Sequence, residues 1–164
     1  MSTFQVSVSK DYTTFCAGHF ITYDGDQCEQ LHGHNYRAAV RLTGVLNADQ
    51  LVFDFVTLKR MLRTVCDTLD HRMLLPQANP LLQLKIDETA VSVRYKQKQY
   101  VFPREDVVFL PIPNTTAECL AQWVAEQLLL ALSPAHVQGL TCLEVEIEET
   151  FGQSAIYQRK LAAS

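Results

Sequence analysis

The feature that most limits how this chain can fold is a set of stretches in which apolar and polar residues alternate one by one. In the clearest stretch, residues 35–42, Tyr36, Ala38, Val40 and Leu42 alternate with Asn, Arg and Ala. Because successive side chains of a strand point to opposite faces, this pattern predicts a strand with one buried face. Alternating or extended patterns predict further strands at about 4–8, 13–20, 143–148 and 155–157.

Two amphipathic segments lie between these strands. Asp54 is a candidate N-cap for a helix whose apolar residues between 58 and 69 recur at helical spacing. A second helix is predicted to open at the capping-box spacing of residues 115–118 and to end near Ser133-Pro134. Residues 89–95 and 99–102 predict a hairpin between the helices. The order of these elements predicts a single α+β domain. Because only two long helices would leave one face of the sheet partly bare, the pattern also favours oligomerisation.

Composition excludes several classes of protein. The chain has 164 residues with 48% hydrophobic and 20% charged residues, as in ordinary globular domains. Its net charge of -4 argues against a general nucleic-acid or anionic-membrane binder. The apolar runs are too short to span a bilayer, and the N-terminal stretch predicts a strand and not a signal peptide. Five scattered cysteines favour free thiols in a reducing cytoplasm.

Three of the five histidines fall within sixteen positions, at His19, His32 and His34. On a strand, the imidazoles of His32 and His34 point to the same face, and an antiparallel return can bring His19 alongside. Three neutral imidazoles suit Zn²⁺ and leave one coordination position open, as in catalytic sites. The alternative is three surface or core histidines with ordinary hydrogen-bond partners.

Cys28 lies four residues before His32. Next to zinc its thiol is expected to have a lowered pKa and to serve as a base or nucleophile. Two alternatives stay open from spacing alone. Cys28 can be a fourth zinc ligand, which would close the site, or an inert buried thiol.

Three further positions have a double interpretation. Asp70-His71 follows the first helix and is either a proton relay or a surface cap. Glu149 interrupts the alternation of its strand, so its carboxylate can accept N–H donors from a heterocycle or be a solvated strand end. Thr115 and Thr116 can bind a ligand, but helix capping explains at least one of them.

These stretches together resemble the 6-pyruvoyltetrahydropterin synthase / 6-carboxytetrahydropterin synthase family. The combination of CxxxHGHxY with a downstream DH and a late ET is specific, and the matches follow the family's order over nearly the whole chain. They are FCAGH (15–19), CEQLHGHNY (28–36), LTGVL (42–46), LVFDFVTLK (51–59), LDHRML (69–74), NTTAECLA (114–121) and EETFGQSAIY (148–157).

The resemblance implies the tunnelling fold (T-fold), an antiparallel sheet with two main helices on one face that assembles into multi-subunit barrels. It implies a homohexamer of two trimers with active sites at subunit interfaces, and a pterin substrate, 7,8-dihydroneopterin triphosphate. By position, it implies Zn²⁺ bound by the three histidines. It also implies a proton-abstracting base at Cys28 and a relay formed by Asp70 and His71. Glu149 would anchor the pterin, with help from Thr116.

The spacing of Cys28 and His32 favours the carboxy branch of the family, which releases acetaldehyde and feeds queuosine synthesis. The alternatives are the pyruvoyl branch, which eliminates triphosphate, a non-catalytic pterin-binding paralogue, and a closed structural zinc site. The segment at about 80–113 is longer than the family norm and is interpreted as a hairpin insertion. Its cations are either a solvated surface or a flap that meets the triphosphate: Arg94, Lys96, Lys98 and Arg104.

Overall fold

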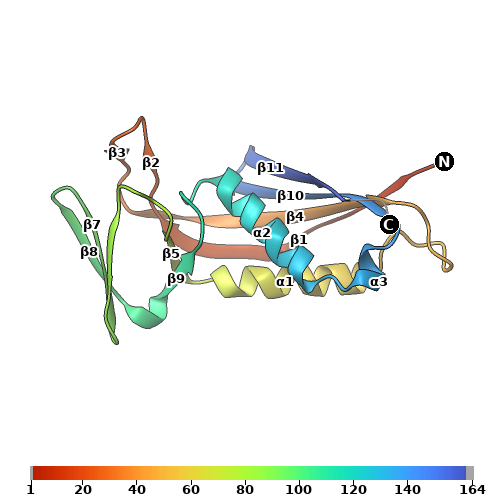
Figure 1. The fold of residues 1–164 in the computed structure, drawn as a ribbon, viewed down its shortest axis with the longest axis horizontal. Helices are drawn as coiled ribbons and strands as arrows, with labels where there is room; N and C mark the ends of the chain where they lie inside the picture. The colour runs from red at the N-terminus through yellow and green to blue at the C-terminus, as the bar shows by residue number, and fades with distance from the viewer. Residues whose placement is uncertain (1, 162–164) are drawn as a thin grey trace.

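The computed structural model describes residues 2–161, apart from the side chains of Lys10, Pro134 and Ala135. A long twisted sheet has two helices on one face, and a small second sheet lies at one end (Figure 1). This is the α+β T-fold architecture that the resemblance implies. Within the described residues, no helix is long and apolar enough to cross a membrane.

The main sheet has six strands in the order β11-β10-β4-β1-β5-β9. The antiparallel part contains β1 (Phe4–His19), β4 (His32–Gly44), β10 (Leu140–Thr150) and β11 (Gln153–Lys160). The prediction of two strands at 4–8 and 13–20 is corrected, because β1 is one long strand with an irregularity between Ser9 and Thr14.

Two parallel strands at one edge, β5 (Arg72–Pro76) and β9 (Val107–Leu110), were not predicted. Four of the five β5 residues are buried, so this strand has no exposed face on which polar residues would recur. Alternation is the signal for a half-buried strand, and strands buried on both faces lack it.

The two long helices are α1 (Phe55–Leu69) and α2 (Ala117–Ala131), followed by the short α3 (Pro134–Val137). Asp54 caps α1 as predicted, accepting from the backbone N–H groups of Val56 and Thr57. The predicted capping box on α2 is shifted by one residue. Thr116 is the N-cap and accepts from Cys119 N, because the hydroxyl of Thr115 is buried and donates to the Phe20 carbonyl.

A second sheet lies beside the C-terminal end of β1, where the chain was predicted to form a hairpin. It has three strands, β6 (Gln83–Ile86), β7 (Ala90–Tyr95) and β8 (Lys98–Pro103), followed by a 3-10 turn at Arg104–Asp106. A ribbon of two-residue strands, β2 (Thr22–Tyr23) and β3 (Gln27–Cys28), lies at the same end (Figure 1).

The apolar core has two parts. The larger part fills the space between the main sheet and the two helices. The smaller part lies under the second sheet and joins it to Met73 and Leu75 of β5. The three histidines of interest lie near the boundary between these parts, where β1 ends and β4 begins.

Candidate metal centre

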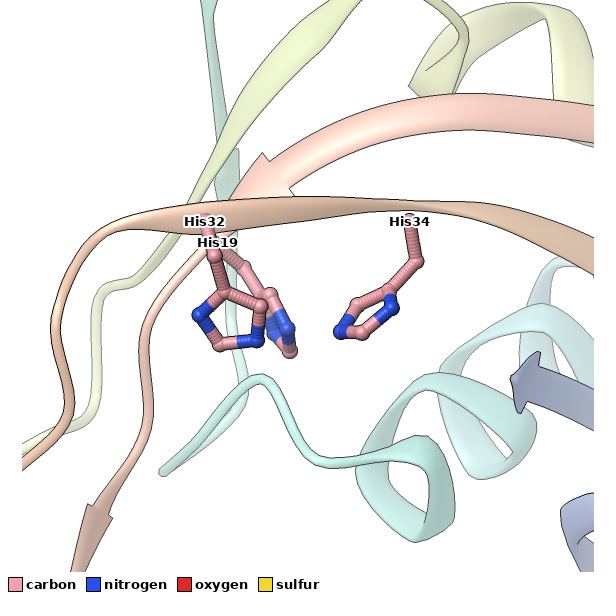
Figure 2. Close-up of side chains that lie close together, drawn as sticks. All are labelled: His19, His32 and His34. Atoms are coloured by element: carbon pink, nitrogen blue, oxygen red, sulfur yellow. The ribbon is translucent and has the colours of Figure 1, made fainter.

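The register of β1 and β4 brings the three predicted ligands together. His19 lies opposite His32, and Ala17 lies opposite His34. The next residue on the same face of β4, Tyr36, is fully buried, so the histidines lie on the face that the helices cover. Figure 2 shows the rings on one side of the strands, toward the segment that leads into α2. Their candidate ligand atoms all lie within 4.8 Å of one another.

Backbone carbonyls fix the orientation of two of the rings. His19 Nδ1 donates to the Thr115 carbonyl at 2.9 Å, and His32 Nδ1 donates to the Gln30 carbonyl at 2.8 Å. Since a carbonyl can only accept, each Nδ1 carries a proton, so in the neutral ring the lone pair is on Nε2. The Nε2 atoms of His19 and His34 are buried and have no hydrogen-bond partner.

This arrangement fits a divalent metal of the zinc type. A buried nitrogen without a partner is destabilising unless an ion or water satisfies it. Burial lowers the pKa of His19, and His32 and His34 act in the same direction, whereas the Thr115 carbonyl and Glu149 oppose this effect. His19 is therefore neutral at pH 7, which is the form that coordinates a metal. Three imidazoles, two of them oriented by second hydrogen bonds to carbonyls, are typical of zinc sites that keep one position open.

Glu149 lies beside this cluster. A register shift between Glu148 and Thr150 breaks the pairing of β10 with β11 at this position. The Glu149 carboxylate Oε1 lies 3.4 Å from His19 Nε2 and 3.7 Å from His34 Nε2. The irregularity that was predicted from the broken alternation therefore turns a carboxylate toward the three imidazoles.

A cavity of about 350 Å³ opens next to the histidines. His19 and His32 line it, together with Glu149 and the N-cap residue Thr116. The Thr116 hydroxyl accepts from the helix and still has its own proton to donate. The structure thus brings five of the eight predicted site residues together: His19, His32, His34, Thr116 and Glu149.

Cys28 is near this cavity but does not line it. Its half-buried side chain packs against the apolar cluster under the second sheet. Burial raises the pKa of the Cys28 thiol, Glu29 acts in the same direction, and Lys98 partly opposes them. The protein surroundings therefore raise the pKa of Cys28, whereas the sequence predicted a lowered pKa next to zinc.

Asp70 and His71 form the expected pair but lie outside the cavity. Asp70 Oδ2 lies 3.0 Å from His71 Nδ1, and Asp70 Oδ1 accepts from the Cys16 backbone at 2.7 Å. That backbone hydrogen bond, with a smaller contribution from His71, lowers the pKa of Asp70 and keeps it ionised. The His71 side chain is 82% exposed, and neither residue of the pair lines the cavity beside the metal cluster of its own chain.

Glu29 is a site residue that sequence reasoning missed. Its carboxylate lines the cavity, lies 4.0 Å from His32 Nε2 and is 3.4 Å from the Ile21 N–H, which donates to it. The only signal in the sequence is its position between Cys28 and His32, where an exposed loop carboxylate is an equally ordinary interpretation.

A larger cavity of about 510 Å³ lies at the other end of β4. It is lined by residues 45–54 and their neighbours, and its histidine, His136, packs its ring on Phe53. No group of three potential metal ligands was found there among the described residues. The smaller cavity is therefore the candidate site.

Gly33 sets the close approach of β1 and β4 between the ligands. A Cβ at this position would lie 3.0 Å from the Ala17 carbonyl oxygen, which is backbone and cannot turn aside. Gly33→Ala should push β1 away and separate His19 from His32, weakening Zn²⁺ binding roughly tenfold, as loss of ligand support typically does. Competition with a chromophoric chelator measures this.

The matched control is Gly18→Ala, directly across the ladder from Gly33. A Cβ there meets the flexible Met73 side chain at 3.3 Å, which can move. Equal Zn²⁺ affinity in the Gly33 variant and the wild type would contradict the close-packing argument.

The fold and site define an α+β protein with a three-histidine centre that opens onto a cavity. The family model described as 6-pyruvoyl tetrahydropterin synthase matches residues 7–160. Because that match covers nearly all of the chain, the protein belongs to the 6-pyruvoyl tetrahydropterin synthase family.

Two relatives by sequence carry the name of the carboxy branch. A Methanocaldococcus jannaschii protein, provisionally named 6-carboxy-5,6,7,8-tetrahydropterin synthase, is 34% identical over 148 residues, 90% of each chain. The Haemophilus influenzae 6-carboxy-5,6,7,8-tetrahydropterin synthase is 31% identical over 156 residues, covering 92% of this chain and 97% of that one.

A similar solved structure carries the name of the pyruvoyl branch. It is the 6-pyruvoyl tetrahydropterin synthase of Plasmodium vivax, with a TM-score of 0.93 at 29% identity over 98% of this chain and 100% of that chain. A second structure of the same Plasmodium enzyme is of a variant whose replaced glutamate is described as a catalytic residue.

Proposed function

We propose that this protein is a zinc-dependent 6-carboxy-5,6,7,8-tetrahydropterin synthase. It would convert 7,8-dihydroneopterin triphosphate to 6-carboxytetrahydropterin and release acetaldehyde and triphosphate. The observation that carries the proposal is the set of three imidazoles, two with buried unpartnered Nε2 atoms, beside a cavity that also holds Glu149. The names of the two relatives and their coverage support the carboxy branch.

His19, His32 and His34 would hold the zinc. When bound there, zinc would polarise the side-chain hydroxyls of the substrate as a Lewis acid. Glu149 would accept the paired N–H donors of the pterin ring, with the Thr116 hydroxyl as a further partner. Both residues line the same cavity as His19, so the ring and its side chain could be held together.

Cys28 would remove a proton from the substrate side chain. Its thiol is protonated at neutral pH because burial raises its pKa, so it needs a partner that takes the proton. The Asp70–His71 pair has the chemistry of such a partner, since the ionised Asp70 carboxylate orients the His71 ring. In its own chain, however, His71 is exposed and lies outside the cavity.

We therefore propose that His71 completes the site of a neighbouring subunit, in the hexamer of two trimers that the family resemblance implies. This arrangement gives a sharp prediction. His71→Asn and Cys28→Ala should each be inactive alone. When the two variants are mixed, mildly dissociated and reassembled, they should recover roughly a quarter of wild-type activity. Some sites then combine an intact Cys28 from one subunit with an intact His71 from another.

The control for this experiment is a mixture of His71→Asn with Asp70→Asn, which damages one side of the interface only and should stay inactive. Failure of the first mixture to recover activity, with reassembly confirmed by light scattering, would contradict a shared site.

Glu29 favours a second candidate, a synthase of the pyruvoyl branch. Its carboxylate faces the cavity, whereas the Cys28 thiol does not line it. The pyruvoyl-named Plasmodium relative, 28% identical in its variant form, uses a glutamate described as a catalytic residue.

The experiment that tests the proposal is incubation of the zinc-loaded protein with 7,8-dihydroneopterin triphosphate, followed by mass identification of the pterin. We expect 6-carboxytetrahydropterin and an equal amount of acetaldehyde. A pyruvoyl product without acetaldehyde would favour the second candidate. Stoichiometric zinc without any pterin conversion would contradict both and favour a binding paralogue or a structural zinc site.

A further inference from the structure

The segment that carries Cys28 and Glu29 has little support from the main sheet. It belongs to the β2–β3 ribbon, whose strands have two residues each. One more backbone hydrogen bond, from Glu29 N to the Ile21 carbonyl at 3.0 Å, ties its end to the chain that leaves β1. Two-stranded ribbons of this size are not stable alone in water. Another part of the molecule must therefore hold these two residues in place.

Asn79 and Asn114 hold Thr22 on β2, and the residues at the turn between β7 and β8 hold the segment that carries Cys28 and Glu29. Lys98 Nζ donates to the carbonyl of Cys28 at 3.2 Å and to the carbonyl of Glu29 at 3.3 Å. Lys96 Nζ lies 2.8 Å from the Asp26 carboxylate and 3.0 Å from the Asp26 carbonyl. The Tyr95 hydroxyl donates to the same Asp26 carbonyl.

The turn itself is fixed to the main sheet. Val91, Val93 and Tyr95 of β7 are buried in the smaller apolar cluster, together with Met73 and Leu75 of β5. β5 pairs with β1 next to His19. The main sheet that carries this predicted metal ligand is therefore packed, through the smaller apolar cluster, against the strand that leads to the turn holding the ribbon. Cys28 also packs against this cluster.

We propose that Tyr95, Lys96 and Lys98, which we call the ribbon clamp, position the Cys28–Glu29 segment against the three-histidine centre. Lys98 is the central positioning residue, because its ammonium bridges the carbonyls of both candidate proton-transfer residues. This inference rests on the proposed function and assigns a role to a segment for which the sequence allowed a solvated surface or a flap for triphosphate. Both lysines of the clamp have partners on the ribbon, and neither of those interpretations includes these contacts.

A positioning role has a distinct kinetic signature. Lys98 contacts backbone and not the cavity, so pterin binding through Glu149 should not depend on it. A misplaced base slows the chemical step strongly, because proton transfer needs close alignment. Loss of the clamp should therefore lower kcat and leave KM nearly unchanged.

The test uses Lys98→Met, which keeps most of the length of the side chain and removes its donors. We expect kcat to fall roughly tenfold with KM within roughly twofold, at unchanged zinc content. Amide hydrogen exchange in residues 22–31 should become roughly tenfold faster, because the ribbon opens more often. Lys98→Arg should restore most of both values, since a guanidinium can donate to two carbonyls.

Lys85→Met is the matched control. Lys85 lies on β6 of the same small sheet, but its Nζ pairs with Asp87 at 3.5 Å and not with the ribbon. It should leave kcat and exchange in 22–31 unchanged. Lys96→Met provides a second variant of the clamp with the same direction of effect, should Lys98→Met fold poorly.

Two results would overturn the inference. One is unchanged exchange in residues 22–31 of the Lys98→Met protein. The other is a rise in KM at constant kcat, which is the signature of a lysine that binds triphosphate. The exchange measurement needs no turnover. If the wild-type protein were inactive and exchange in the Lys98→Met protein were still faster, the clamp would be supported and only the proposed function contradicted.

Discussion

Replacement of Cys28 by alanine should leave zinc and the oligomer in place and lower turnover of 7,8-dihydroneopterin triphosphate by roughly 10²- to 10⁴-fold, as expected for loss of a proton-transfer group. The metal should stay because the three imidazoles converge without the thiol, which packs instead toward the second sheet. Acetaldehyde release and zinc content by atomic absorption measure the two effects separately.

Cys142→Ala is the matched control, because Cys142 is another partly buried free thiol but lies on β10, outside the cavity. It should keep full activity. Loss of zinc from the Cys28 variant would show that the thiol is a fourth ligand and that the site is closed. Retained turnover in that variant, together with loss of turnover in Glu29→Gln, would assign the base to Glu29.

Replacement of His32 by alanine should remove the metal and, with it, all measurable turnover. The loss of affinity should exceed the roughly 10- to 100-fold effect of removing only a supporting partner, because a first ligand is lost. The fold should persist, since the His32 ring is partly exposed and lies at the end of its strand. Zinc content after dialysis and the circular dichroism spectrum measure these two outcomes.

The control is His136→Ala, a histidine at the other end of the molecule whose ring packs on Phe53. That variant should keep its zinc. An unchanged zinc content in the His32 variant, or equal losses in the two variants, would contradict the ligand assignment.

Periodic patterns predicted the parts of the fold in which one face is buried. The alternation at 35–42 and 143–148 corresponds to β4 and β10, and the capping residue Asp54 starts α1. Strands without an exposed face gave no such signal, which is why β5 and β9 were missed. Likewise, the N-cap of α2 is Thr116 and not the predicted Thr115, because the Thr115 hydroxyl donates to the Phe20 carbonyl.

The histidine cluster was predictable because it depends on strand periodicity and one antiparallel pairing, both of which are local. The surroundings of Cys28 were not, because the apolar cluster against which it packs is built mostly from residues between 73 and 107. The direction in which His71 points depends on the path of the chain after α1, which no spacing reveals. Glu29 was not predicted as a site residue, because the neighbouring Cys28 has the stronger sequence signal.

We expect the three-histidine centre to perform a zinc-dependent reaction on a dihydropterin. Titration of Zn²⁺ into metal-free protein, with acetaldehyde release from 7,8-dihydroneopterin triphosphate as the readout, tests it most directly. We expect no release without metal and a linear rise that stops at one zinc per chain. Release that is independent of zinc, or zinc binding at one per chain without any release, would contradict it.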